Sequence, residues 1–296
     1  MDPDPNSTLA LAFAIASSLC FGLALVASRV GLRTLDARSG AAISVPAATL
    51  LFVLAAPFAF DGSGFTLQAG LVFAAVGLFF PALVTLLTFR SVEELGPTLT
   101  GAVSGTTPLF AVLAAGLILG EKVPPHAALA CVGIVIGVTL LTWKQDAVRP
   151  GFSGWSLAWP IAGAVVRGLA QAIAKAGLML WPNPFAAGLI GYLVSTGTVI
   201  GADRLRRSTR PAVTKHGVTW FGITGALNGS AVLLMYAALS EAPVALVAPI
   251  VATYPLTTAL ASALLLREER VTLRLVVGGC IAVASSMILV GFNRAG

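Results

Sequence analysis

The chain has little charge: of its 296 residues only 10% are Asp, Glu, Lys or Arg, whereas 57% are hydrophobic. Soluble globular domains carry about 25% charged residues, so this composition excludes an ordinary soluble protein. Helical membrane proteins are built from long apolar segments with charges confined to their ends. We therefore expect an integral membrane protein.

Cysteine and histidine are scarce as well. The three cysteines, Cys20, Cys131 and Cys280, lie within apolar stretches, and their odd number favours small hydrophobic residues over a disulfide framework. Both histidines, His126 and His216, lie near the ends of such stretches. Without clustered His, Cys or Asp, the sequence predicts no metal site, no cofactor and no catalytic centre. We expect that the protein is not an enzyme.

Acidic side chains are absent from the middle of every apolar stretch. All 12 Asp and Glu residues lie near the ends of these stretches or between them. Exporters of cationic drugs commonly bind the cation or a proton on a carboxylate inside the membrane. The missing carboxylate therefore counts against a cationic substrate and against simple carboxylate-based proton coupling.

The sequence does contain ten apolar stretches, each of about 20 residues, which is the length that crosses a bilayer as a helix. They span residues 8–32, 41–60, 67–88, 96–120, 126–143, 156–180, 184–201, 218–240, 243–266 and 273–292. The first is preceded by acidic residues and is too long for a signal peptide, so we expect it to be retained. The prediction is an all-α integral membrane protein with ten transmembrane helices.

The chain is also a repeat. Residues 89–121 match residues 236–268 at a constant offset of 147 (255 − 108 for Pro108 and Pro255), with ten identities in 33 positions. Residues 11–32 match residues 157–178 at an offset of 146. We predict a first five-helix repeat at 8–143, a linker at 144–155 and a second five-helix repeat at 156–292. Because five is odd, the repeats must be inverted, an architecture that many secondary transporters share.

Basic residues indicate an orientation and a partner. Thirteen Lys and Arg residues follow odd-numbered stretches, against two (Lys122 and Arg294) at the termini and after even-numbered stretches. The positive-inside rule then predicts that both termini face away from the cytoplasm. The basic run 203–215 dominates this count and is interpreted as a topology anchor beside membrane lipid. No nucleic-acid partner is expected.

The stretch at 156–180 carries the strongest candidate site. Arg167, Gln171 and Lys175 follow a spacing of four, which places them on one face of a helix. A central Arg costs about 2.5–3.5 kcal/mol on insertion scales, so Arg167 should face the protein interior or a wet cavity. It would suit a substrate carboxylate or phosphate. The alternative is a structural Arg bound to backbone carbonyls, and for Lys175 snorkelling to the interface is equally favoured.

Weaker candidates complete the predicted site. Trp159 and Tyr254 could contact a substrate side chain, and Asn228 and Thr107 could line a cavity. Ser and Thr in membrane helices more often bond to their own or a neighbouring helix. The remaining polar candidates are Thr85, Thr88, Ser104 and Thr106. Prolines at 81, 108, 249 and 255 are expected to interrupt or kink helices and free backbone carbonyls.

The repeated segments resemble a known family. Residues 106–110 (Thr-Thr-Pro-Leu-Phe) and 119–123 (Leu-Gly-Glu-Lys-Val) are similar to the fourth-helix signature of the EamA family, in the drug/metabolite transporter superfamily, with a second copy at 253–268. The resemblance implies a ten-helix exporter of amino acids or other small metabolites in the bacterial inner membrane. It also implies structural roles for Glu121 and Glu268. Two features depart from the family: Phe21 and Gly22 stand where a Trp-Gly pair is common, and members are usually drawn with cytoplasmic termini.

Together these observations predict a secondary transporter that exports small carboxylate-bearing metabolites, amino acids first, by alternating access of the two repeats around a central cavity. Arg167 would hold the carboxylate, Gln171 would assist, and Trp159 or Tyr254 would contact the side chain. The alternatives are a multidrug or cation exporter and a non-transporting membrane scaffold. The sequence leaves the substrate, coupling ion, direction and oligomeric state open, and a monomer is compatible with it.

Overall fold

The computed structural model describes residues 5–121, 154–205 and 214–266, with isolated positions at 129, 132, 133 and 136. Within these ranges the protein is helical and contains no strand. Eight helical spans in this part of the chain are long and apolar enough to cross a membrane. Only those isolated positions of the predicted stretch at 126–143 are described, and the stretch at 273–292 lies outside the described residues, so the total of ten stays a prediction. The same holds for the boundaries of the linker at 144–155.

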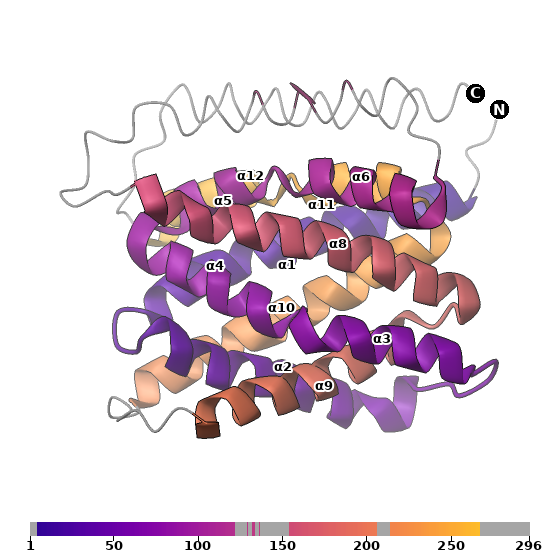
Figure 1. The fold of residues 1–296 in the computed structure, drawn as a ribbon. Helices are drawn as coiled ribbons and strands as arrows, with labels where there is room; N and C mark the ends of the chain where they lie inside the picture. The colour runs from indigo at the N-terminus through magenta and orange to yellow at the C-terminus, as the bar shows by residue number, and fades with distance from the viewer. Residues whose placement is uncertain are drawn as a thin grey trace.

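The first repeat contributes two continuous and two broken spans (Figure 1). They are α1 (Pro5–Gly31), α2 (Ala37–Ala59), α3 (Leu67–Phe79) with α4 (Ala82–Leu95), and α5 (Pro97–Ser104) with α6 (Thr107–Leu119). The second repeat contributes α8 (Ala158–Leu180), entered through the 3-10 turn η2 (Gly154–Leu157), then α9 (Pro184–Leu205) and α10 (Lys215–Glu241). It ends in α11 (Val244–Val251), α12 (Tyr254–Ala261) and the π-helical turn η3 (Ser262–Leu266).

Local chemistry explains where these helices begin and break. Asp36 accepts a hydrogen bond from the backbone N–H of Ser39 at 2.9 Å and caps α2. Three of the four prolines expected to interrupt helices lie at the breaks: Pro81 separates α3 from α4, Pro108 lies in the first turn of α6, and Pro255 in the first turn of α12. Proline suits the start of a helix because its missing N–H would be unpaired there anyway.

The second spans of the two repeats, α2 and α9, pack antiparallel. Thr49 of α2 shares a 2.7 Å hydrogen bond with Thr196 of α9, whereas Phe52, later on α2, contacts Phe185, earlier on α9, with ring centroids 5.5 Å apart. Equivalent helices that run in opposite directions are the signature of an inverted repeat. Thr49 and Thr196 are also separated by 147 positions, the offset of the repeat. The pseudo-two-fold axis therefore passes through this hydrogen bond.

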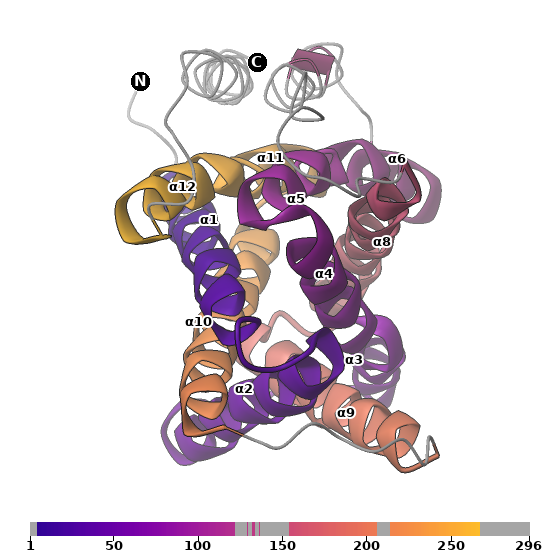
Figure 2. The same cartoon turned by 90° about the vertical axis from the view of Figure 1, so that its left-hand side faces the viewer.

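The other interfaces occur twice with the repeats exchanged. The interface of α1 with α10 corresponds to the interface of α8 with α3 and α4. The interface of α2 with α10 corresponds to that of α9 with α3, and the interface of α6 with α8 corresponds to that of α12 with α1. Figure 2, which looks nearly along the spans, shows α1, α10 and α12 on one side and α8, α3 and α6 on the other. The two halves thus surround a shared centre, and α4 enters that centre from the first repeat.

Glycines let helices from different halves approach closely. A Cβ atom built on Gly225 of α10 would lie 2.3 Å from the backbone oxygen of Ser44 in α2. One built on Gly168 of α8 would lie 2.7 Å from the backbone nitrogen of Ala111 in α6. Small residues commonly allow such backbone contacts between membrane helices, where van der Waals packing is the main attraction.

Candidate functional site

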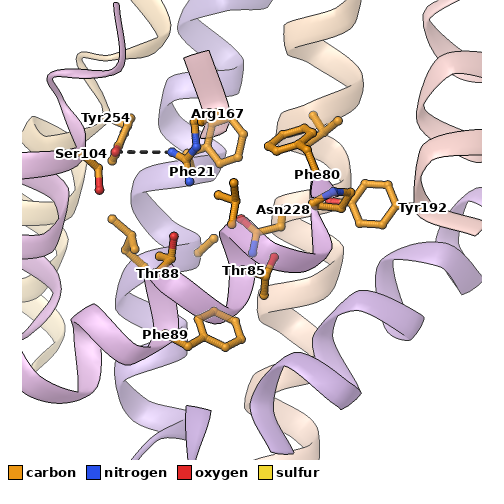
Figure 3. A pocket seen from close by; sticks show the side chains of 15 residues that line it. Phe21, Phe80, Thr85, Thr88, Phe89, Ser104, Arg167, Tyr192, Asn228 and Tyr254 are labelled. Atoms are coloured by element: carbon orange, nitrogen blue, oxygen red, sulfur yellow. Dashed lines mark hydrogen bonds between the residues drawn. The ribbon is translucent and has the colours of Figure 1, made fainter. Parts of the chain in front are cut away.

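A cavity lies where the two repeats meet (Figure 3). Its described lining comes from seven helices and the break before α4: Phe21, Ala24, Leu25, Phe80, Pro81, Val84, Thr85, Thr88, Phe89, Ser104, Arg167, Tyr192, Asn228, Val232 and Tyr254. The cavity volume is about 30 Å³, and one water molecule needs roughly 10–15 Å³ on this measure. In this conformation the cavity therefore has room for about two waters.

Arg167 is the charged residue of this lining. Its side chain is 8% exposed, and its guanidinium carbon lies 5.2 Å from the centroid of the Phe21 ring and 5.7 Å from that of Tyr254. Nη1 donates a long, 3.4 Å hydrogen bond to the Tyr254 hydroxyl, and Nε has no partner. No acidic side chain among the described residues forms an ion pair with it. Two aromatic faces thus stabilise the cation, but no anion neutralises it.

Pairs of repeat mates meet in the lining of the cavity. Phe21 of α1 and Arg167 of α8 are equivalent positions (167 − 21 = 146), and they are in contact. Pro81 and Asn228 are equivalent as well (228 − 81 = 147), and both line the cavity. The cavity therefore lies on the pseudo-two-fold axis. The symmetry is broken where one half supplies a cation and the other a ring.

Glycine at position 22 determines how closely Phe21 approaches this centre. A Cβ atom on Gly22 would lie 2.5 Å from Cβ of Thr257 and 2.9 Å from the backbone oxygen of Tyr254. The bare backbone lets α1 rest directly on α12, which brings the Phe21 and Tyr254 rings to 6.2 Å between centroids. The Phe-Gly pair that departs from the usual Trp-Gly thus retains its glycine for a packing reason.

The structure brings three of the six predicted site residues together. Arg167, Asn228 and Tyr254 line the cavity, as do the weaker candidates Thr85, Thr88 and Ser104. Gln171 is not in the described lining, although it is 1% exposed and its Oε1 atom has no partner. Thr107 is also outside the lining, and its hydroxyl donates to the backbone oxygen of Ser104 at 2.6 Å. That is the structural role expected of many membrane threonines.

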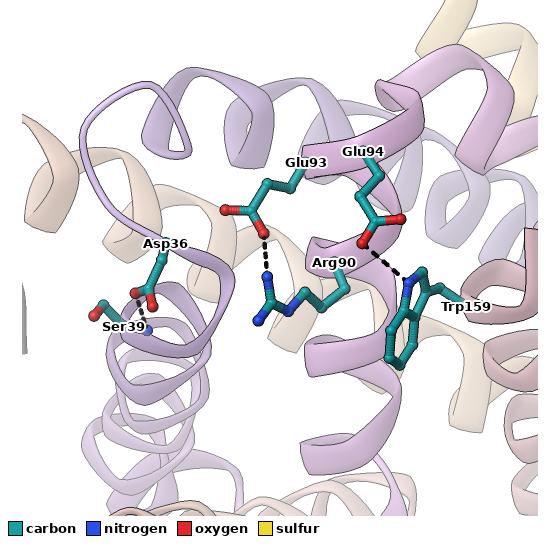
Figure 4. Close-up of polar contacts among 6 residues, drawn as sticks. All are labelled: Asp36, Ser39, Arg90, Glu93, Glu94 and Trp159. Carbon is teal, nitrogen blue, oxygen red and sulfur yellow. Dashed lines mark hydrogen bonds and ion pairs between the residues drawn. The ribbon is translucent and has the colours of Figure 1, made fainter. Parts of the chain in front are cut away.

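Trp159 is outside the described lining of the cavity, and its contact with substrate stays a prediction. Its side chain is 38% exposed, and Nε1 donates to the Glu94 carboxylate at 3.1 Å (Figure 4). It precedes Arg167 by eight residues, which corresponds to about 12 Å along a helix that rises 1.5 Å per residue. It belongs to a polar cluster at the start of α8, beside the Arg90–Glu93 ion pair of 2.9 Å.

Lys175 and Glu121 have structural roles near the other end of α8. The Lys175 ammonium donates to the backbone oxygens of Leu239 and Ala242, at 2.7 and 3.2 Å, which occupies carbonyls left free at the end of α10. The Glu121 carboxylate accepts from the N–H of Val244 at 3.3 Å and so caps the start of α11. Lys175 therefore binds a helix end instead of the membrane interface, and Glu121 acts as the resemblance implied.

Sequence reasoning missed Tyr192 of α9. Its side chain is 2% exposed and lines the cavity, and its hydroxyl has no hydrogen-bond partner within the described part of the chain. The ring stacks on Phe52, with centroids 5.3 Å apart and planes 28° apart. Tyr192 is the one tyrosine in the stretch 184–201, and that was the available signal. Elsewhere, the described residues contain no group of three His, Cys, Asp or Glu side chains that could hold a metal ion.

Comparisons with known proteins agree with this architecture. The model of the EamA-like transporter family matches residues 8–143 and 154–291, which covers both repeats. No curated protein matches the chain. Among 28 matching chains of solved structures, one described only as "Crystal structure of protein" has a TM-score of 0.73 at 14% identity, over 97% of this chain and 96% of that one. That likeness shows the fold alone. The family match identifies the chain as a member of the EamA-like transporter family.

Proposed function

We propose that this multi-pass membrane protein exports small carboxylate-bearing metabolites, a class that includes amino acids, across the bacterial inner membrane. The observation that carries the proposal is the buried, unneutralised Arg167 in a cavity between two inverted repeats. Transport would proceed by alternating access, in which the halves rock around this centre.

The geometry of Arg167 favours a carboxylate. The guanidinium carbon lies over the rings of Phe21 and Tyr254, and at the edge of the group Nε has no partner. A guanidinium edge matches the two oxygens of a carboxylate and binds them with paired, charge-assisted hydrogen bonds. Burial of the cation without an anion is unfavourable, and an anionic substrate would remove that penalty.

The remaining residues support a binding role at this centre. The Tyr254 hydroxyl and Asn228 supply neutral hydrogen-bonding groups beside Arg167, and Gln171 lies one helical turn beyond it with a buried, unpartnered oxygen. A cationic substrate would instead meet a positive charge and no acidic side chain in the described lining. A scaffold would gain nothing from an unpaired central Arg.

Alternating access is favoured by the position and size of the cavity. It lies on the axis between the halves and has room for about two waters, so a metabolite requires a wider conformation. The broken spans α5–α6 and α11–α12 pack on each other across the same axis. Breaks of this kind are common at the substrate sites of transporters built from inverted repeats.

Efflux of labelled carboxylates from proteoliposomes tests the proposal. Arg167→Gln keeps much of the side-chain volume but removes the charge, and we expect transport to fall by about two orders of magnitude, the effect of losing roughly 3 kcal/mol of charge-assisted hydrogen bonding. Arg167→Lys keeps the charge but loses the paired hydrogen-bond geometry, so its transport rate should lie between those of wild type and Arg167→Gln. The matched control is Arg90→Gln, because Arg90 is half-exposed and pairs with Glu93 at a helix end. Wild-type rates for Arg167→Gln, in protein shown to fold by its melting curve, would refute the role of Arg167.

A further inference from the structure

The cavity has two chemically different ends. Arg167, Tyr254 and Ser104 lie at one end, whereas Tyr192 and Phe80 lie at the other, with Asn228 and Thr85 between them (Figure 3). The first end carries the positive charge. The second end carries the Tyr192 hydroxyl, and the groups between the ends are a hydroxyl and an amide, which can donate or accept hydrogen bonds but carry no charge.

The net charge of the lining is positive. Arg167 contributes one positive charge, and none of the residues that line the described cavity is acidic. The sequence also places every Asp and Glu near the ends of the apolar stretches or outside them. A substrate carboxylate balances the single positive charge. An ammonium group on the same substrate would enter a low-dielectric site with no anion left to pair with it.

Tyr192 supplies a specific partner at the far end. The stacked Phe52 ring holds the Tyr192 ring in place, so its hydroxyl position is defined by packing. Tyr192 lines the cavity, and its hydroxyl is buried and has no described partner. Buried hydroxyls are almost always hydrogen-bonded, so an unpartnered one beside a cavity is available to a polar group of a ligand.

From these observations we propose that the site selects a net monoanion whose second polar group is uncharged, with Arg167 receiving the carboxylate and the Tyr192 hydroxyl receiving the neutral group. This inference rests on the proposed function, because it assigns the carboxylate to Arg167. It narrows the substrate class to hydroxy, oxo or amide-bearing monocarboxylates in preference to zwitterionic amino acids. The selectivity follows from charge balance at one end and hydrogen bonding at the other.

Four ligands on one six-carbon skeleton test the two ends separately: hexanoate, 6-hydroxyhexanoate, norleucine and 6-hydroxynorleucine. Their dissociation constants are measured by calorimetry on the purified full-length protein, and shorter homologues of four and five carbons repeat the comparison. We expect the acids without an ammonium to bind at least tenfold tighter than their amino counterparts. We expect 6-hydroxyhexanoate to bind about tenfold tighter than hexanoate, the usual effect of satisfying a buried polar group.

Substitution of Tyr192 then tests whether the tighter binding of 6-hydroxyhexanoate than of hexanoate depends on the Tyr192 hydroxyl. Tyr192→Phe removes the hydroxyl but keeps the ring that stacks on Phe52, and it should abolish the advantage of the hydroxylated acid without weakening hexanoate. Tyr236→Phe is the matched control, since Tyr236 is a second buried tyrosine and does not line the cavity. An unchanged hydroxyl advantage in Tyr192→Phe would overturn the assignment of Tyr192, because a water would then satisfy that group.

The same ligands separate failure of this inference from failure of the proposed function. If Arg167→Gln binds all four ligands as wild type does, the carboxylate site itself is wrong. If Arg167→Gln abolishes binding but the amino compounds bind as tightly as the others, the carboxylate site stands and the monoanion selectivity is overturned.

Discussion

Two glycines of α10 offer a matched test of the contact between the halves. Gly225 faces α2, and a Cβ atom there would lie 2.3 Å from the backbone oxygen of Ser44, whereas a Cβ atom on Gly222 would meet nothing within 4 Å. Ordinary contact at such a position begins near 3.4 Å, so Gly225→Ala requires a displacement of about 1.1 Å (3.4 − 2.3). The obstructing atom belongs to the backbone of another helix and cannot rotate aside.

The expected free energies have opposite signs at the two positions. Ala is favoured over Gly inside a helix by about 0.8–1.0 kcal/mol, so Gly222→Ala should stabilise the protein. Overpacking costs about 1–3 kcal/mol, and a backbone clash belongs at the upper end of that range. After subtraction of the helix-propensity gain, Gly225→Ala should destabilise by about 2 kcal/mol, which leaves about 3 kcal/mol between the variants.

Thermal unfolding of both variants in the same detergent measures this difference. Each kcal/mol shifts the melting temperature of a 150–250-residue domain by roughly 2–4 °C, so Gly225→Ala should melt several degrees below wild type and Gly222→Ala at or above it. Because Ser44 and Gly225 belong to different repeats, the Gly225 variant should also transport more slowly. If Gly225→Ala melts with Gly222→Ala or above it, α2 and α10 do not pack backbone to backbone as described.

Two further experiments probe the polar contacts between helices. Lys175→Met keeps much of the length of the side chain but leaves the carbonyls of Leu239 and Ala242 without their donor. The free energy of unfolding, followed by the melting curve, should therefore fall by about 1–3 kcal/mol. An unchanged curve would contradict the role of Lys175 at the end of α10. Thr49→Val and Thr196→Val, alone and combined, should show a coupling energy of about 0.5–1.5 kcal/mol across their shared hydrogen bond. Strictly additive effects in that double-mutant cycle would mean that the axial hydrogen bond contributes nothing.

The membrane spans could be predicted because a bilayer restricts which secondary structures can cross it. A chain inside hydrocarbon must satisfy its backbone hydrogen bonds within each segment, so apolar length translates directly into helices. The predicted stretch 96–120 corresponds to Pro97–Leu119, and 243–266 to Val244–Leu266. The predicted stretch 67–88 was too short, since the span continues to Leu95 through its polar last turn. Hydropathy alone ended it at the charges of Arg90, Glu93 and Glu94.

The site could be predicted from the sequence only where a single residue has a large free-energy cost of insertion into the membrane. Arg167 stood out because a central charge must be sheltered wherever it lies, and the structure buries it. Trp159 shares its helix, yet the spacing rule indicates a face and says nothing of how far from the membrane centre a side chain lies. Tyr192 was not predicted because its position at the cavity depends on stacking against Phe52, which is 140 positions away (192 − 52) and belongs to the other repeat.

The sequence by itself determined that the chain is a membrane protein, that it is doubled, and that one half carries a central cation its mate lacks. These properties depend on composition, length and internal comparison, which need no knowledge of contacts. The tertiary structure decided which residues meet: Arg167 lies against Phe21, its own repeat mate, with Tyr254 and Tyr192 at opposite ends of one cavity. Such pairings arise from the packing of helices across a pseudo-two-fold axis, and only the folded chain places that axis.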